Sequence, residues 1–501
     1  MALTTGRQVA RFTLIYGFGV VTQRLVSFIM LPIYTRYLTP ADYGVLELLE
    51  MTLAVVGIVA TGGVIGVFKF YKDRGDDEAR AELVSTAAVS RSSLGAIVAL
   101  LGWLFAPELT SLVLGADTPA LYFRLVFLAY LFQVSAVVPL NHLRLIHKPG
   151  LFVAASAIQL VLALTGNIYF VVVRGMNVEG VLWGGLIAKA AVAMALGGFT
   201  LRRVGLHFSW STVRQLTRYG SPLILWGLAD FVVVFSDRFF LKAHWDLAVV
   251  GVYSLAYKFP FLLSSLALGP FRMTWQPMRF EAARRPDAPA FFGRVFLLVN
   301  CGLALLALAI ALGITDLLRI MAAEPFWGAA DLVPILLVAQ VFISWTSLVD
   351  VGLLLRERTG WFALLAAVSV AATLGINQLL IPSFGAPGAA WATLAIGVVR
   401  FGSVYSFAQR AYRIPYPWGR IVALFAIAAA TGGLHWSLRP EALLLSMTFA
   451  AVLWAAAFGL VWRVVLTDAD RLSLREFVGD AVGRLLARTN AAGDSHMGTG
   501  S

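Results

Sequence analysis

The feature that most constrains this chain is a succession of apolar runs, each about 20 residues long, that continues from one end to the other. Runs of this length cross roughly 30 Å of hydrocarbon as helices, and they lack the alternation of a membrane β-barrel. Charged residues make up only 13% of the chain, and the mean hydropathy is +0.82. We therefore predict an all-α polytopic membrane protein with about fourteen transmembrane helices, at 12–34, 43–67, 84–105, 119–141, 151–173, 178–200, 219–241, 247–270, 290–313, 328–352, 360–381, 386–408, 417–437 and 441–463.

The net charge of +12 is distributed unevenly between the loops. Alternate loops are basic, as in the segment with Arg202, Arg203, Arg214 and Arg218, whereas the intervening loops hold few cations. The positive-inside rule then places both termini in the cytoplasm of a multi-pass protein. Because topology accounts for the basic excess, nucleic acid is not an expected partner.

Two segments of the chain resemble each other at a nearly constant offset. "GLFVAASAIQLVLALTGN" ends in Asn167 and is followed by Gly180-x-x-Trp183. "GWFALLAAVSVAATLGIN" ends in Asn377 and is followed by Gly388-x-x-Trp391, at offsets of 377 − 167 = 210 and 391 − 183 = 208. Gly44 and Gly251 correspond at 251 − 44 = 207. An even number of spans per copy predicts a parallel repeat of two six-helix lobes, with two additional carboxyl-terminal helices.

The repeat sets the expected domain boundaries. We expect an amino-terminal lobe at 1–201, a cytoplasmic amphipathic linker at 202–218, a second lobe at 219–410, two further helices at 411–465 and an amphipathic cytoplasmic tail at 466–501. The linker contains "SWST", where Ser209 or Ser211 is expected to cap the next helix. The final "SHMGTGS" resembles a cloning scar and is left out of the fold.

Residue patterns for catalysis, metals or cofactors are missing from the sequence. The single Cys301 lies in an apolar run, and the six histidines give no helix-spaced ligand pair. We expect no catalytic residues, no metal and no cofactor, and therefore no enzyme.

Charged residues inside the apolar runs are the candidate site, because a charge facing lipid at mid-bilayer costs about 2.5–3.5 kcal/mol or more. A hydrated cationic cavity is one interpretation, and salt bridges inside a lobe or snorkelling is the other. The basic candidates are Arg24, Lys258, Lys189, Arg91 and Arg124. Two acidic residues of the run at 219–241, Asp230 and Asp237, could bind a coupling ion or neutralise Arg238 and a neighbouring Lys.

The stretch "LPIYTRYLTPADYGVLELLEM" at 31–51 resembles the first-loop signature of the Wzx-type polysaccharide-biosynthesis flippases, a family of the multidrug/oligosaccharidyl-lipid/polysaccharide exporter superfamily. "SFGAPGAAW" after Asn377 is similar to a recurrent segment of the same family. The resemblance implies a two-lobed, fourteen-span transporter in the bacterial plasma membrane, a component of the cell envelope pathways that make O-antigen or exopolysaccharide.

The same resemblance implies that the chain translocates polyprenyl-pyrophosphate-linked oligosaccharide from the inner to the outer leaflet by alternating access, driven by an ion gradient or the membrane potential. Arg24, and then Lys258 and Lys189, are expected to pair with the diphosphate. The lipid-linked oligosaccharide and the lipid bilayer are the expected partners, with a glycan polymerase and glycosyltransferases of the pathway as further candidates.

Two other functions remain open at this point. A multidrug or organic-cation antiporter would share the fold but would need an acidic or aromatic cavity, which Arg24 and Lys258 oppose. A membrane glycan polymerase or ligase would need a sizeable outer loop with catalytic residues, and the expected outer loops are short.

Overall fold

The computed structural model describes residues 30–61, 64–355 and 360–472, and every element in these ranges is a helix. The prediction of an all-α membrane protein is therefore confirmed. Ten described helices or continuous helical runs are long and apolar enough to cross a membrane, so the expected count of fourteen is not confirmed. The first expected span, 12–34, lies almost entirely outside the described residues.

The chain divides into two compact units, Met1–Pro270 with Leu317–Ala411, and Phe271–Asp316 with Tyr412–Ser501. The described helices of the first unit are α2 (Leu31–Tyr37), α3 (Pro40–Thr61), α4 (Val64–Asp73), α5 (Asp77–Leu104), α6 (Ala106–Val113), α7 (Leu121–Leu145), α8 (Pro149–Asn167), η1 (Ile168–Val173), α9 (Asn177–Val204), α10 (Trp210–His244), α11 (Leu247–Leu263), η2 (Ser264–Leu268), η3 (Glu324–Phe326), α14 (Ala329–Val349), α15 (Val351–Leu355) and α16 (Gly360–Ala411).

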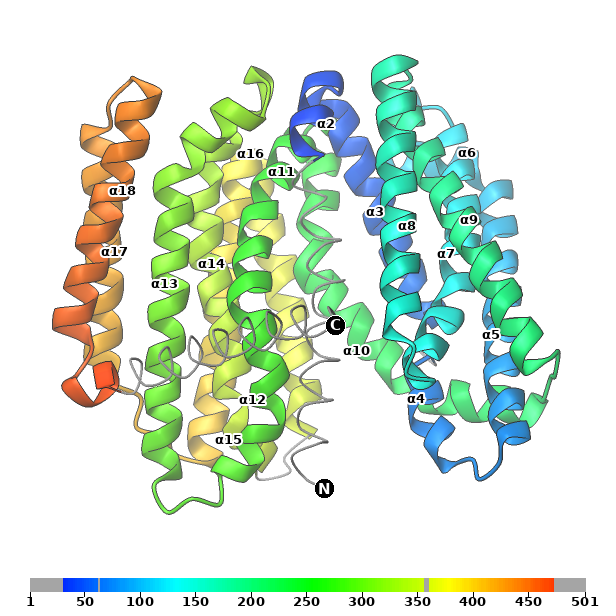
Figure 1. The fold of residues 1–501 in the computed structure, drawn as a ribbon. Helices are drawn as coiled ribbons and strands as arrows, with labels where there is room; N and C mark the ends of the chain where they lie inside the picture. The colour runs from blue at the N-terminus through cyan, green and yellow to red at the C-terminus, as the bar shows by residue number, and fades with distance from the viewer. Residues whose placement is uncertain (1–29, 62–63, 356–359, 473–501) are drawn as a thin grey trace, which may run out of the picture. The chain divides into compact units, whose positions relative to one another are not determined.

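The first unit contains two groups of packed helices (Figure 1). In the first helix group, α7 packs against α5 and α9, and α8 packs against α9. In the second helix group, α16 packs against α10 and α14, and α14 packs against α11. Helix α3 follows α2 in the chain and makes its most extensive contact with α11, so it joins the two groups.

Equivalent residues begin α3 and α11. The Thr39 hydroxyl accepts from the Asp42 amide at 3.1 Å, and the Asp42 carboxylate accepts from the Thr39 amide at 2.9 Å, which is a reciprocal cap. Asp246 caps α11 by accepting from the Val249 amide at 2.8 Å. These caps share the repeat offset, 246 − 39 = 207, so both helices place a glycine at the same distance from their first residue.

That glycine brings the two backbones into contact. A Cβ added to Gly44 would overlap the carbonyl oxygen of Leu247, and one added to Gly251 would overlap the carbonyl oxygen of Pro40. The contact is reciprocal, because 251 − 44 and 247 − 40 are both 207. Small residues allow such close helix packing in membranes, where helices gain little from the hydrophobic effect.

The resembling segments also fold alike. In the first copy, Gly175 has a φ of +66° between η1 and α9. In the second copy, Gly385 has a φ of +60° inside α16 and divides that helix into two arms. Glycine tolerates this left-handed backbone, and the offset, 385 − 175 = 210, is that of the two asparagines. The parallel repeat therefore extends to backbone conformation.

The linker helix begins as its sequence predicted. Ser209 is the N-cap of α10, and its hydroxyl accepts from the Thr212 amide at 3.4 Å. The preceding residues are tied to α5, since the His207 amide donates to the Ser85 hydroxyl at 2.8 Å.

The described part of the second unit contains residues 271–316 of α12 (Gly269–Ala282) and α13 (Ala288–Met321). It also contains three whole helices, α17 (Trp418–Leu438), α18 (Leu443–Leu460) and η4 (Val461–Val465). Helices α17 and α18 run side by side (Figure 1). Leu308 and Leu312 of α13 pack with Ala450 and Ala457 of α18.

Two carboxylates fix this unit. Asp316 accepts from Arg439 at 2.5 Å and from Ser446 at 2.6 Å. Asp470 accepts from Arg294 at 2.7 Å and from Arg420 at 3.3 Å. Burial acts to raise the pKa of Asp470, but hydrogen bonds from Thr467 and Arg294 outweigh it and hold the pKa below its usual value.

The glycine crossing leads to a stability prediction. Gly44→Ala and Gly251→Ala should each lower the free energy of unfolding by about 1–3 kcal/mol, because the added methyl group forces α3 and α11 apart. Gly57→Ala is the matched control on α3, since its Cβ would meet only Tyr130 at 3.9 Å. Thermal unfolding in detergent measures the effect, and equal midpoints for Gly44→Ala and Gly57→Ala would contradict it.

Candidate functional site

A polar cavity of about 590 Å³ lies within the first unit, among α3, α7, α8 and α9. Its polar side chains come from four different helices: Glu50 from α3, Tyr130 and Gln133 from α7, Gln159 from α8 and Lys189 from α9. The remaining lining residues are small or aliphatic, among them Ala54, Gly57 and Ala136. Polar groups at membrane depth normally face water or one another, so we expect water to enter this cavity.

Each polar residue of the cavity interrupts an otherwise apolar helix. Lys189 lies near the middle of α9, between Ala188 and Ala190, and Gln159 stands in the run "AIQLVLAL" of α8. On either helix, such a residue avoids hydrocarbon only when it faces a neighbouring helix. The cavity combines one ammonium, one carboxylate, two amides and a phenol, a set that can bind hydroxyl and phosphate groups through hydrogen bonds.

An ion pair joins the two helix groups beside the glycine crossing. The Nζ of Lys258 on α11 lies 3.9 Å from Oε1 of Glu47 on α3, and the two side chains are 23% and 13% exposed. The same Nζ lies 4.9 Å from the centre of the Tyr43 ring. Glu47 follows Gly44 by three residues, so the pair lies one turn further along the helix crossing.

Asp237 and Arg238 form a buried pair on α10. Nη1 of Arg238 donates to Oδ1 of Asp237 at 2.7 Å, and the side chains are 3% and 7% exposed. The Tyr253 hydroxyl donates to Oδ2 of Asp237 at 2.5 Å and lies 3.1 Å from the Thr393 hydroxyl. The Arg238 guanidinium lies 4.0 Å from the centre of the Tyr257 ring. The two charges therefore neutralise each other inside the second helix group, although Nε of Arg238 is buried without a hydrogen-bond partner.

Asp230 has a different environment, seven residues earlier on the same helix. Nη2 of Arg400 on α16 lies 3.3 Å from its Oδ1, and the Asp230 side chain is 49% exposed. Of the two acidic candidates, Asp230 is thus the more exposed.

Two further candidates, Arg91 and Arg124, lie apart from the cavity lining. Arg91 on α5 is largely buried and interacts electrostatically with Tyr130, which itself lines the cavity. The Arg124 guanidinium on α7 lies 5.5 Å from the centre of the Trp103 ring. Arg24 lies outside the described residues. The structure therefore brings Lys189 to the cavity, Lys258 to the ion pair beside the crossing, and Arg91 close to a lining residue.

Sequence reasoning missed four of the residues that matter here. Gln133, Gln159 and Tyr130 are neutral, and only their position inside apolar runs could have pointed to a cavity. Arg400 lies in the expected span 386–408, and its charge inside an apolar run could have marked it as a candidate site residue.

A family model described as "Polysaccharide biosynthesis protein" matches residues 22–279, which is more than half of the 501 residues. The chain belongs to the polysaccharide biosynthesis protein family. The matched part of this family member contains the polar cavity, the ion pair and the buried Asp237–Arg238 pair. No curated protein matches the sequence.

Solved structures share the fold of this family member. The structure titled "Lipid II flippase MurJ, inward closed conformation" has a TM-score of 0.70 at 11% identity and covers 91% of this chain and 99% of its own. An inward-facing multidrug resistance MATE family transporter of the MOP superfamily has a TM-score of 0.64 at 14% identity, with coverages of 80% and 95%. A MOP superfamily transporter from Pyrococcus furiosus, whose title reports a binding pocket of reverse polarity, has a TM-score of 0.51 at 13% identity, with coverages of 80% and 94%.

The buried pair leads to a prediction for this family member. Asp237→Asn should lower the free energy of unfolding by about 3–5 kcal/mol, because it leaves the Arg238 guanidinium buried without its counter-charge. Asp230→Asn is the control on the same helix and should cost less than about 1 kcal/mol, since the Asp230 side chain is 49% exposed. Thermal unfolding of the two variants in one detergent compares them. Similar losses would show that Asp237 is no more critical than Asp230.

The ion pair between the helix groups leads to a second prediction. In a double-mutant cycle, Glu47→Gln and Lys258→Met should couple by about 1 kcal/mol, since each single change strands a poorly exposed charge. The exposed pair Arg80 and Asp77, 3.1 Å apart, serves as the control and should couple by no more than a few tenths of a kcal/mol. If the losses in free energy of unfolding at positions 47 and 258 were additive, a direct interaction between the two side chains would be contradicted.

Proposed function

We propose that the chain is a flippase that moves polyprenyl-pyrophosphate-linked oligosaccharide from the inner to the outer leaflet of the bacterial plasma membrane, with both termini cytoplasmic. The observation that carries this proposal is the polar cavity with Lys189, enclosed by membrane-spanning helices in a member of a polysaccharide biosynthesis family. A diphosphate with attached sugars is anionic and strongly hydrated, so its passage needs polar partners at membrane depth. The polyprenyl chain can remain in hydrocarbon throughout.

Different cavity residues would bind different parts of such a headgroup. The Lys189 ammonium is the described cation that would pair with the diphosphate, and Arg24, outside the described residues, is proposed to join it. Gln133, Gln159, Tyr130 and Glu50 offer donors and acceptors for sugar hydroxyls. Arg91 and Arg124 would add positive potential from outside the lining.

Alternating access is the mechanism that the contacts between the helix groups favour. Besides the Glu47–Lys258 ion pair, the Thr35 hydroxyl donates to the Met321 carbonyl at 3.1 Å, and the Tyr43 ring meets Phe326 edge-on. In the proposed orientation these contacts belong to the outer end of the bundle. We infer that they form a closed outer gate, which Lys258 and Glu47 release when the cavity opens outward.

The driving force is proposed to be an ion gradient or the membrane potential, which provides about 2.3 kcal/mol per charge moved through 100 mV. Asp230 is the better coupling-ion candidate, because about half of its side chain is exposed, whereas Asp237 is buried and held by Arg238 and Tyr253.

Export of organic cations is the second candidate function. The observation in its favour is Glu50, an exposed carboxylate in the cavity, together with the shared fold of MATE transporters. A glycan polymerase or ligase has no such support, since the similar structures reported above are those of transporters and a flippase.

Reconstitution in liposomes tests the proposal. The wild-type protein should expose a fluorescent polyprenyl-pyrophosphate-linked saccharide to a membrane-impermeant reagent. Lys189→Gln should slow this at least about tenfold, because a charge-assisted contact to the diphosphate is lost. Lys72→Gln, an exposed lysine at the end of α4, is the control and should retain the wild-type rate.

Three results would contradict the proposal. One is a wild-type rate for Lys189→Gln. Another is transport of organic cations without movement of the lipid-linked saccharide, which would favour the exporter. The third is a lengthened saccharide among the products, which would favour a polymerase.

A further inference from the structure

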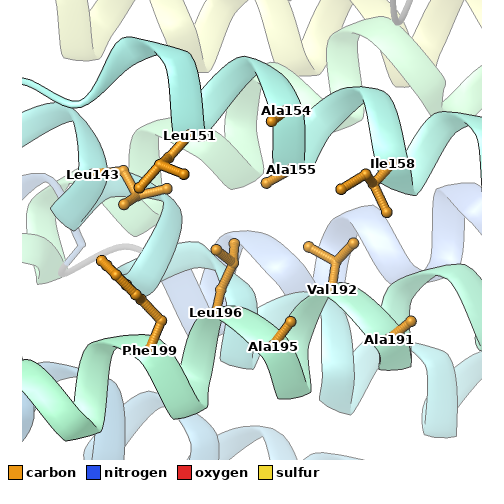
Figure 2. A pocket seen from close by; sticks show the side chains of 10 residues that line it. All are labelled: Leu143, Leu151, Ala154, Ala155, Ile158, Ala191, Val192, Ala195, Leu196 and Phe199. Atoms are coloured by element: carbon orange, nitrogen blue, oxygen red, sulfur yellow. The ribbon is translucent and has the colours of Figure 1, made fainter.

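An apolar groove of about 250 Å³ lies between α8 and α9, closed on one side by Leu143 of α7 (Figure 2). Figure 2 shows side chains of α8 and α9 directed toward each other across it. Every lining residue is apolar, and four of them are alanines, Ala154 and Ala155 from α8 with Ala191 and Ala195 from α9. The groove is thus distinct in chemistry from the polar cavity, although α7, α8 and α9 contribute to both.

The groove results from a divergence of two helices. At one end of the pair, a Cβ added to Gly166 would lie 2.9 Å from the Cα of Gly184, so α8 and α9 are in backbone contact there. Toward the start of α8 the alanines are too small to fill the widening gap, and Leu151 and Ile158 remain 44% and 55% exposed. An empty apolar gap loses its dispersion contacts, so in a bilayer it is favourable for a hydrocarbon chain to occupy it.

The wide end of the groove is positively charged. Lys148 directly precedes α8, and Arg202 lies in the last turn of α9; both are exposed. Helix α8 has no side-chain cap at its first turn, so the positive end of its dipole lies next to Lys148. Between Asp117 and Asp230 the sequence contains one acidic residue, Glu179, at the opposite end of α9. Glu82 of α5 lies near the start of α10, where it accepts from the Thr212 hydroxyl at 3.1 Å.

Three exposed apolar residues, two of them aromatic, follow α9 at the same end. Leu206, Phe208 and Trp210 are 76%, 56% and 73% exposed. Exposed aromatic residues beside basic ones are typical of the membrane–water interface. The wide end of the groove therefore lies at the depth of lipid headgroups.

We propose that this groove is a binding site for an anionic phospholipid, with one acyl chain between α8 and α9 and the phosphate at Lys148 and Arg202. The apolar lining would hold the acyl chain, and Lys148 and Arg202 would favour a negatively charged headgroup. The site is separate from the proposed transport route, and its binding does not depend on the proposed function. In the orientation proposed above, with both termini cytoplasmic, the site lies in the cytoplasmic leaflet.

Native mass spectrometry of the full chain with added phosphatidylglycerol or phosphatidylcholine of identical acyl chains tests the proposal. The wild-type protein should retain phosphatidylglycerol about tenfold more strongly. Ala195→Trp, which fills the groove, should abolish this retention. Met194→Trp, at a neighbouring position that is 65% exposed and does not line the groove, should leave it unchanged.

The double variant Lys148→Gln/Arg202→Gln changes only exposed side chains and should remove the preference between the two lipids. Equal retention of both lipids by the wild-type protein, or undiminished retention by Ala195→Trp, would overturn the proposal. Retention of a polyprenyl phosphate in place of phosphatidylglycerol would also overturn it, because the groove would then belong to the substrate lipid.

Discussion

The contact between the backbones of α3 and α11 is the constraint on which the first unit depends. It exists because both helices carry a glycine where they cross, Gly44 and Gly251, and because equivalent caps at Thr39 and Asp246 begin the helices in register. In a bilayer, helices associate through close packing and polar contacts. A side chain at this crossing would therefore force α3 and α11 apart. The reciprocal geometry also relates the two copies of the repeat, since each glycine meets the helix that carries the other.

Charged groups of this chain are accommodated at membrane depth in three ways, and these ways distinguish structural from functional residues. Asp237 and Arg238 neutralise each other in a buried cluster, where they are costly to disturb and unavailable to a substrate. The charges of Glu47 and Lys258 compensate each other across the crossing of α3 and α11. In the proposed mechanism, this ion pair breaks when the two helices separate. Lys189 and Glu50 line a polar cavity, which is where we propose that a headgroup binds.

Much of the fold follows from the sequence, because apolar runs, caps and glycines act locally. The helical class, the repeated segments and the N-cap at Ser209 are readable from neighbouring residues. The ion-pair partners of the charged residues cannot be predicted in this way, because contacts such as Lys258 with Glu47 or Asp230 with Arg400 join residues far apart in the chain. Likewise, packing alone associates residues 271–316 with the chain beyond Tyr412, which the repeat pattern did not suggest. Arg24, the first candidate by sequence, lies outside the described residues.

We propose that the contact between α3 and α11 at Glu47 and Lys258 separates during transport, and a reversible cross-link tests this most directly. With Cys301 replaced by serine, cysteines at positions 47 and 258 can be joined by a bifunctional thiol reagent, and transport of the lipid-linked saccharide can be measured before and after reduction. Our account predicts that transport stops when the two helices are joined and returns when the link is reduced. Undiminished transport by the fully cross-linked protein would contradict it.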